Sequence, residues 1–180
     1  MQAYGKAADP AVSTPSLSPE ALIELQRNTV AEHIRNEQSK DWPGVYGTFT
    51  PREEQAYYDV VPLQTRFSGI KGVISFYESI ARGFPDFELT VHSEQDVPGM
   101  STREMQITGT RNGEYLGIGP TGRRVSVALA AFYVFDQATG HLNAERVYFD
   151  NNTVFAQIQG QMSPEDVFDL SRMERGDAAA

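Results

Sequence analysis

The feature that most limits how this chain can fold is an alternating stretch, residues 123–135, in which both sets of side chains are apolar. One set is Val125, Val127, Leu129, Ala131 and Tyr133, and the other is Ala128, Ala130, Phe132 and Val134. Two-residue alternation predicts a strand, and a strand apolar on both faces has to be covered on both. Helices can cover both faces, or a helix layer can cover one while a cavity or partner covers the other. This strand is therefore a first indication of a pocket.

Further strands are predicted before and after it. Apolar and polar residues alternate from Phe87 and again around Met105, which predicts two strands. A last strand is predicted over residues 142–150. Residues 55–62 are rich in β-forming side chains and end in a proline, so they are expected to form a short edge strand.

Helical patterns precede these strands. Ser18-Pro19 is typical of a helix start, with an N-cap residue followed by proline at the first helical position. This first helix is expected to end near Ser39, and a second is predicted over residues 70–83. Residues 40–51 fit either a short helix or a packed loop. Helices followed by consecutive strands indicate an α+β fold rather than alternating βαβ units.

The length of 180 residues suits one domain. Residues 1–17 contain few large apolar side chains, so we expect a flexible leader there. The folded domain is predicted to span residues 18–160, with a short helix at 151–159. Residues 161–180 are expected to form a C-terminal helix and a loose tail.

Composition excludes several classes of function. Without cysteine, the chain has no thiolate nucleophile and no zinc–thiolate site. The net charge of −9 is spread along the chain without a Lys/Arg cluster, so nucleic acid is not an expected partner. No apolar stretch approaches the roughly 20 residues of a membrane span, and we expect a soluble cytoplasmic protein. The glycine-rich residues 112–122 precede a strand and not a helix, which disfavours a phosphate-binding loop.

Several segments, taken in order, resemble the SnoaL-like polyketide cyclases, or predicted ester cyclases, of the nuclear transport factor 2-like superfamily. They are Gly69-Ile70-Lys71-Gly72, Phe84-Pro85-Asp86-Phe87, residues 113–123, Glu145-Arg146-Val147-Tyr148-Phe149-Asp150 and Gln157-Ile158-Gln159-Gly160. The resemblance implies a cone-shaped fold in which a bent antiparallel sheet and the N-terminal helices enclose a pocket. It also implies a homodimer formed through the outer face of the sheet.

The resemblance further implies chemistry without metal or cofactor. In cyclases of this family an aspartate on the last strand acts as general acid/base in an intramolecular aldol ring closure, and Asp150 resembles that residue by its place after Tyr148-Phe149. These cyclases usually carry a histidine on the preceding long strand. Residues 123–135 contain none.

Asp150 shares one strand face with Arg146 and Tyr148. If that face points into the pocket, burial raises the pKa of Asp150 toward neutrality, whereas Arg146 opposes the rise. Tyr148 could then donate a hydrogen bond to a ligand carbonyl, and Arg146 could bind a substrate carboxylate. The alternatives are that Asp150 caps the next helix, that Tyr148 packs in the core with its hydroxyl at the rim, and that Arg146 forms an ion pair.

His33 and Glu37 lie one helical turn apart. This spacing could hold a metal or let Glu37 orient the imidazole of His33 as a base, although two ligands alone are a weak metal signal and His33 could simply pack or be solvated. We therefore expect no metal, a catalytic role for His33 and substrate contacts for Glu37. Further substrate contacts are expected from Trp42, Tyr58 and Phe132, with a packed edge strand as the alternative for Tyr58.

Together these features predict a cofactor-independent enzyme that uses acid/base chemistry on a small to medium apolar carbonyl compound, in ring closure or isomerisation. One alternative in the same fold is water addition, as in epoxide hydrolases, which a second carboxylate in the cavity would favour. The other is a non-catalytic binding protein for an apolar small molecule. Polar groups that converge on one point of the cavity would favour catalysis.

Overall fold

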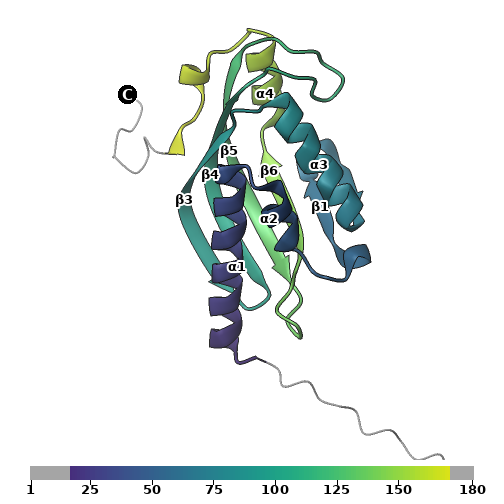
Figure 1. Ribbon diagram of the computed structural model, residues 1–180. Helices are drawn as coiled ribbons and strands as arrows, with labels where there is room; N and C mark the ends of the chain where they lie inside the picture. The colour runs from purple at the N-terminus through teal and green to yellow at the C-terminus, as the bar shows by residue number, and fades with distance from the viewer. Residues whose placement is uncertain (1–16, 171–180) are drawn as a thin grey trace, which may run out of the picture.

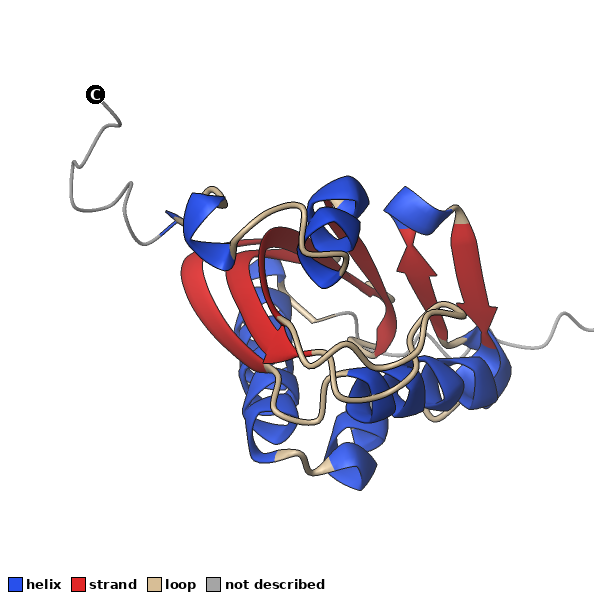
Figure 2. Ribbon diagram, turned by 90° about the horizontal axis from the view of Figure 1, so that it is seen from above, coloured by secondary structure: helices blue, strands red, loops and turns tan. Residues whose placement is uncertain are grey.

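The computed structural model describes residues 17–170 and shows a curved sheet with helices packed against one side (Figures 1 and 2). The helices are α1 (Pro19–Ser39), α2 (Trp42–Gly47), α3 (Gly69–Gly83) and α4 (Asn151–Ile158), with short 3-10 helices η1 (Glu53–Gln55), η2 (Val61–Leu63) and η3 (Pro164–Asp166). The strands are β1 (Tyr57–Val60), β2 (Thr65–Ser68), β3 (Glu88–Val97), β4 (Met100–Thr110), β5 (Arg124–Phe135) and β6 (Leu142–Phe149). The predicted α+β class is confirmed.

The six strands form one sheet in the order β2-β1-β6-β5-β4-β3. Neighbouring strands are antiparallel except β1 and β6, which run parallel, so the predicted antiparallel sheet is correct for all pairs but this one. The predicted edge strand at residues 55–62 also differs, because β1 lies between β6 and β2. The β2 segment is only four residues long and mostly exposed, so its sequence carries no clear strand pattern.

The two apolar faces of β5 are covered differently. Val125, Leu129 and Tyr133 belong to the buried set, which faces the helices and is part of the main core. The alternate set, which includes Ala130 and Phe132, lies on the outer face and is half-buried. The pattern in the sequence therefore correctly indicated a strand with two apolar faces, of which the inner one meets helices and a cavity.

Helix α1 is fixed at its start and along its length. Ser18 is the N-cap and accepts a hydrogen bond from the backbone N–H of Ala21 at 3.2 Å, as Ser18-Pro19 predicted. Buried Gln26 donates to the carbonyl of Val97 at 3.1 Å and accepts from the backbone N–H of Gly99 at 2.9 Å. These bonds join α1 to the turn between β3 and β4. They fix the position of α1 along the sheet, and therefore the position of its later turns.

Helix α2 resolves the choice between a short helix and a packed loop for residues 40–51. Asp41 is its N-cap and accepts a hydrogen bond from the backbone N–H of Gly44 at 3.1 Å. Thr48 follows α2 and contacts α1 through its hydroxyl, which lies 2.7 Å from Nδ1 of His33. Helix α3 follows β2 and buries Val73, Phe76 and Tyr77 against the sheet.

Helix α4 follows β6 and lies beside the first residues of β5, where β6 no longer pairs with that strand. Buried Gln157 accepts a hydrogen bond from the backbone N–H of Ser126 at 2.8 Å and donates to the carbonyl of the same residue at 2.8 Å. The Gln157 side chain thus makes hydrogen bonds to both the N–H and the C=O of one β5 residue, and these bonds attach α4 to the sheet.

The described residues include only part of the two terminal segments that the sequence analysis separated from the domain. The predicted leader, apart from Leu17, lies outside the described residues, as do residues 171–180. Within residues 161–170, the helix expected after Ser163 is only the three-residue η3. No helix within residues 17–170 is long and apolar enough to cross a membrane.

Candidate active site

A cavity of about 110 Å³ lies between the inner face of the sheet and α3. Its walls are mostly aliphatic and aromatic side chains from β4, β5, β6, α3 and the segment before β3, among them Phe76, Phe84, Phe87, Met105, Val127 and Phe149. Four polar side chains meet at one end of this space, namely Glu37, Tyr58, Tyr77 and Glu145. With His33, which lies directly behind them, we call these residues the buried polar cluster.

His33 is fully buried on α1 and its protonation is defined by Thr48. The Thr48 hydroxyl donates its proton to the carbonyl of Val45 at 2.7 Å. It can therefore only accept from Nδ1 of His33, 2.7 Å away, so Nδ1 carries a proton. The second ring nitrogen, Nε2, is left facing the carboxylates, 3.2 Å from Glu145 Oε2 and 3.7 Å from Glu37 Oε1.

Glu145 is held by two tyrosines. Tyr58 donates a hydrogen bond to Oε1 at 3.2 Å, and Tyr77 donates to Oε2 at 2.9 Å. Burial, together with the charges of Glu145 and Glu37, raises the pKa of both hydroxyls well above the ordinary value, so they remain donors at neutral pH. A carboxyl group that accepts at both oxygens has the hydrogen bonding of an ionised carboxylate. The Tyr77 oxygen also lies 2.9 Å from Nε2 of His33.

Glu37 is the cluster member best suited to exchange a proton. Its pKa is raised from 4.5 to about 7, mainly by burial; the attraction of His33 opposes this rise, and the charge of Glu145 adds to it. For His33, burial lowers the pKa, but attraction to Glu37 and the hydrogen bond to Glu145 outweigh burial and the pKa is raised. At neutral pH, Glu37 is therefore close to the midpoint between acid and base.

A sequence model described as SnoaL-like polyketide cyclase matches residues 31–158, which include every member of the cluster. The chain belongs to this SnoaL-like family. The resemblance drawn from the ordered motifs is confirmed. A comparison with curated proteins finds no match.

Solved structures share the fold at low sequence identity. A proposed SnoaL-like polyketide cyclase from Jannaschia sp. CCS1 gives a TM-score of 0.68 at 20% identity, covering 86% of this chain and 97% of that one. AclR, a proposed hydroxylase from Streptomyces galilaeus, gives 0.65 at 19% identity, covering 78% and 98%. An LEH-like epoxide hydrolase from M. tuberculosis gives 0.59 at 15% identity, covering 77% and 92%. These similarities confirm the predicted nuclear transport factor 2-like fold.

The SnoaL-like resemblance pointed to Asp150, but the structure places this residue outside the cavity. Asp150 is exposed and is the N-cap of α4. It accepts hydrogen bonds from the Thr153 hydroxyl at 2.5 Å and from the backbone N–H of Asn152 at 3.0 Å. The Thr153 bond is the main reason that the pKa of Asp150 is lowered, opposite to the expected rise. The helix-cap alternative describes its position.

The expectation that the Arg146, Tyr148 and Asp150 face points inward is wrong. Tyr148 is 46% exposed and packs against Phe132 on the outer face, with ring centroids 5.4 Å apart. Arg146 lies 3.3 Å from Asp59 and donates to the Tyr57 hydroxyl at 2.7 Å. The opposite set of β6 side chains lines the cavity and includes Glu145. A shift of one residue in strand parity is enough to exchange the two faces.

The other predicted site residues divide between the cavity and its surroundings. Glu37 and Tyr58 line the cavity, and His33 is buried behind them. Trp42 does not line the cavity but stacks on the lining residue Phe87, with ring centroids 5.9 Å apart. The structure thus brings the His33–Glu37 pair together with Tyr58, and it separates Phe132 from all of them.

Sequence reasoning missed Glu145 and Tyr77. Glu145 alternates with Val147 and Phe149 on β6, and a charged side chain followed by two large apolar ones in the same set was the available signal. Tyr77 belongs to the buried stripe of α3 and gave no such signal, because a helical aromatic residue more often simply packs.

The cluster could also hold a cation. His33, Glu37 and Glu145 present ligand atoms within 4.8 Å of one another, and they are the one such group among the described residues. Two contacts of Nε2, to Tyr77 at 2.9 Å and to Glu145 at 3.2 Å, already have hydrogen-bond length. Hydrogen bonds are therefore enough to hold His33 against Tyr77 and Glu145, while Glu37 lies at ion-pair distance, 3.7 Å from Nε2.

The glycine-rich loop between β4 and β5 closes one side of the cavity through Tyr115. Arg111 is fully buried and donates to the carbonyls of Gly113, Tyr115 and Gly119 at 2.8, 3.2 and 3.2 Å. Gly113 lies so close to the end of α3 that a Cβ atom would collide with the carbonyl of Arg82. Arg111 therefore holds Tyr115 in place as a cavity wall.

Proposed function

We propose that this SnoaL-like protein is a cofactor-independent enzyme that moves a proton on an apolar carbonyl compound, with Glu37 as the acid/base. The observation that carries the proposal is the position of the Glu37 carboxyl group, which borders an apolar cavity beside a buried histidine and a second carboxylate. Converging polar groups at one end of an apolar pocket favour catalysis over simple storage of a ligand.

In the proposed step, ionised Glu37 accepts a proton from the carbon next to the substrate carbonyl. The C–H bond breaks, its electron pair forms a double bond to the carbonyl carbon, and the π pair of the carbonyl moves to the oxygen, which gives an enolate. Tyr58 and Tyr77 line the same end of the cavity, and in the proposed step one of their hydroxyls turns from Glu145 and donates its proton to this oxygen instead. The enolate carbon then takes a proton back on its other face, which is isomerisation by inversion of that carbon, or it forms a bond to a second carbonyl whose oxygen takes the proton from Glu37, which is ring closure.

His33 and Glu145 have supporting roles in this proposal. The positive charge of His33 lies 3.7 Å from Glu37 and stabilises its ionised form. Glu145 favours the charged form of His33 and accepts from both tyrosine hydroxyls until one of them turns to the substrate oxygen. Glu37 thus takes the acid/base role that the motifs assigned to Asp150.

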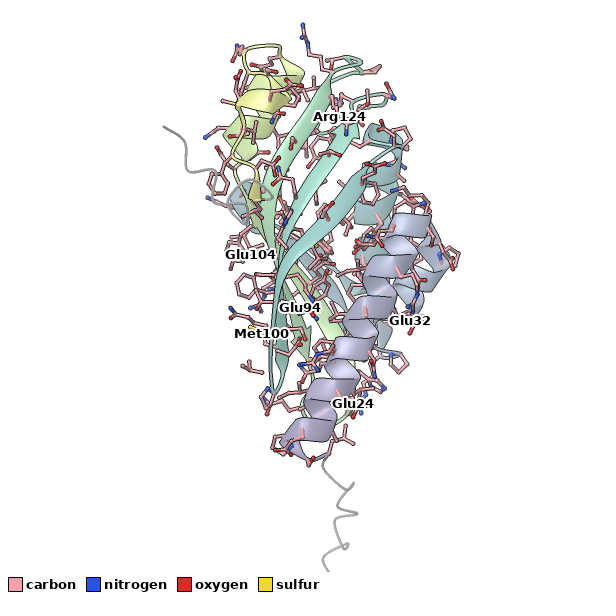
Figure 3. All side chains as sticks on the ribbon, turned by 90° about the vertical axis from the view of Figure 1, so that its left-hand side faces the viewer. Glu24, Glu32, Glu94, Met100, Glu104 and Arg124 are labelled. Atoms are coloured by element: carbon pink, nitrogen blue, oxygen red, sulfur yellow. The ribbon has the colours of Figure 1, made fainter. Side chains whose placement is uncertain are left out.

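The test uses exchange of α-protons and needs no knowledge of the natural substrate. Acetophenone in D2O is followed by NMR, because each proton that the enzyme removes from its methyl group is replaced by deuterium. Glu37→Gln should slow enzymatic exchange by about 100-fold or more, the range of general acid/base catalysis. Glu32→Gln is the matched control, since Glu32 is exposed on the same helix (Figure 3). Exchange by the Glu37 variant at the wild-type rate would rule out this role.

Water addition to an epoxide is a second candidate. Two carboxyl groups, Glu37 and Glu145, border the cavity, which is the feature that favours this reaction. The fold is also that of an LEH-like epoxide hydrolase, at 15% identity. Styrene oxide in 18O-labelled water tests it: labelled diol formed by the wild type and not by Glu37→Gln would support hydrolysis over proton exchange.

We also propose that the domain, residues 18–160, forms a homodimer through the outer face of the sheet. Phe132 and Tyr148 form an apolar, partly exposed pair there. Light scattering at micromolar concentration tests this, with Tyr148→Glu expected to give monomers. A wild-type mass equal to 20.0 kDa would contradict the proposal.

A further inference from the structure

The charged side chains that line the cavity are all acidic. Among the lining residues the ionisable side chains other than tyrosine are Glu37 and Glu145, and no Lys, Arg or His lines the space. His33 lies behind the carboxylates with Nε2 directed at them. We call the end of the cavity at which Glu37, Tyr58, Tyr77 and Glu145 meet the inner end. When Glu145 is ionised, the net charge at this inner end is neutral or negative and never positive.

The nearest cations are occupied outside the cavity. Lys40, whose charge acts on Glu37, donates its ammonium group to the carbonyl of Phe87. Arg111 is fully buried in the glycine-rich loop and donates to three backbone carbonyls. Neither side chain lines the space that a ligand would fill. A ligand carboxylate at the inner end would meet two glutamates and no arginine or lysine.

The rest of the cavity fits hydrocarbon. Phe76, Phe84, Phe87, Leu129 and Val147 are among its walls, and the space is about 110 Å³. In another protein an apolar cavity of about 150 Å³ binds benzene, so the body that fits here is about the size of one ring.

We propose that the cavity selects an uncharged ketone or ester with a body about one ring in size, its carbonyl at the Glu37–Glu145 end, and rejects the carboxylic acid of the same size. This deepens the proposed function, on which it rests for the reaction, whereas the binding preference can be measured without any turnover.

The test compares three ligands with the same number of heavy atoms: acetophenone is neutral, benzoate is negative and benzamidine is positive. Dissociation constants are measured at pH 8 by calorimetry or ligand-observed NMR. Two like charges about 4 Å apart at a protein site repel strongly enough to weaken binding by roughly 100-fold or more, so benzoate should bind at least that much more weakly than acetophenone. Glu37→Gln should recover about tenfold of the benzoate affinity, and the exposed Glu32→Gln should recover none.

Three results would overturn the inference. Benzoate binding within about tenfold of acetophenone would show that charge is not selected. Tighter binding of benzamidine would indicate an amine ligand instead. Absence of acetophenone binding would show that the cavity does not take a ring-sized ketone. Because binding is measured without any reaction, acetophenone that binds as expected but does not exchange its α-protons would contradict the proposed function and leave this inference standing.

Discussion

Replacing Glu37 with glutamine should change how the stability of the protein depends on pH. The folded protein raises the pKa of Glu37 from 4.5 to about 7, mainly by burial. Between these two values the folded chain keeps a proton that the unfolded chain has lost. The free energy of unfolding therefore falls as pH rises from 4.5 through 7, because ionised Glu37 is less favourable inside the fold than in water.

The size of the effect follows from the same two values. The difference between 4.5 and about 7, at about 1.36 kcal/mol for each pH unit, gives roughly 3 kcal/mol as an upper limit. Glu37 is 6% exposed, so solvent screening reduces this little. Since glutamine cannot ionise, Glu37→Gln should be more stable than the wild type at pH 8 by up to that amount, relative to their difference at pH 4.5. A side chain that costs stability where it is active is typical of a functional site.

Urea unfolding at pH 4.5, 6, 7 and 8, followed by fluorescence of Trp42, measures this directly. Trp42 is the single tryptophan and packs beside the cavity wall. The Glu32→Gln variant should parallel the wild type at every pH, because Glu32 is exposed. If the stability of Glu37→Gln also paralleled the wild type from pH 4.5 to 8, Glu37 would not be titrating in a buried site, and the argument for its chemistry would lose its basis.

Other predictions test the remaining parts of the structure. Asp150→Ala should lower the free energy of unfolding by about 1 kcal/mol through loss of the α4 cap, while Asp150→Asn, which can still cap, should change it by less than half as much; equal losses in urea unfolding would contradict the cap. Arg111→Met removes the donors to three loop carbonyls, so amide hydrogen exchange at residues 115–118 should quicken about tenfold while exchange in α1 stays the same; unchanged loop exchange would contradict its role. The α-proton exchange rate should rise with pH through about 7, because Glu37 must be ionised to accept a proton; a rate that falls over this range would contradict that assignment.

Local patterns in the sequence were sufficient for much of the fold. The alternation in residues 123–135 predicted β5 and its two apolar faces, and Ser18-Pro19 predicted the start of α1. Both of these features depend on residues that are close together in the sequence. The parallel pairing of β1 with β6 does not, because it joins residues far apart in sequence, such as Tyr58 and Glu145.

The candidate site was only half predictable for the same reason. The His33–Glu37 pair is visible in one helix, since the residues are one turn apart. Glu145 joins them through contacts with residues 87 and 68 positions away, Tyr58 and Tyr77. Which set of β6 side chains faces inward depends on that pairing and cannot be read from a strand with polar residues in both sets. The family resemblance had singled out Asp150, and the strand pattern alone did not show that Glu145, and not Asp150, faces the cavity.

The central claim is that the reaction takes place at the inner end of the cavity and not at the end of β6. It is tested most directly by measuring α-proton exchange of acetophenone with Glu37→Gln and Asp150→Asn side by side. We expect the Glu37 variant to lose about 100-fold or more in rate and the Asp150 variant to keep a rate within about twofold of the wild type. Loss of exchange in Asp150→Asn, with exchange retained in Glu37→Gln, would contradict the account and return the chemistry to Asp150.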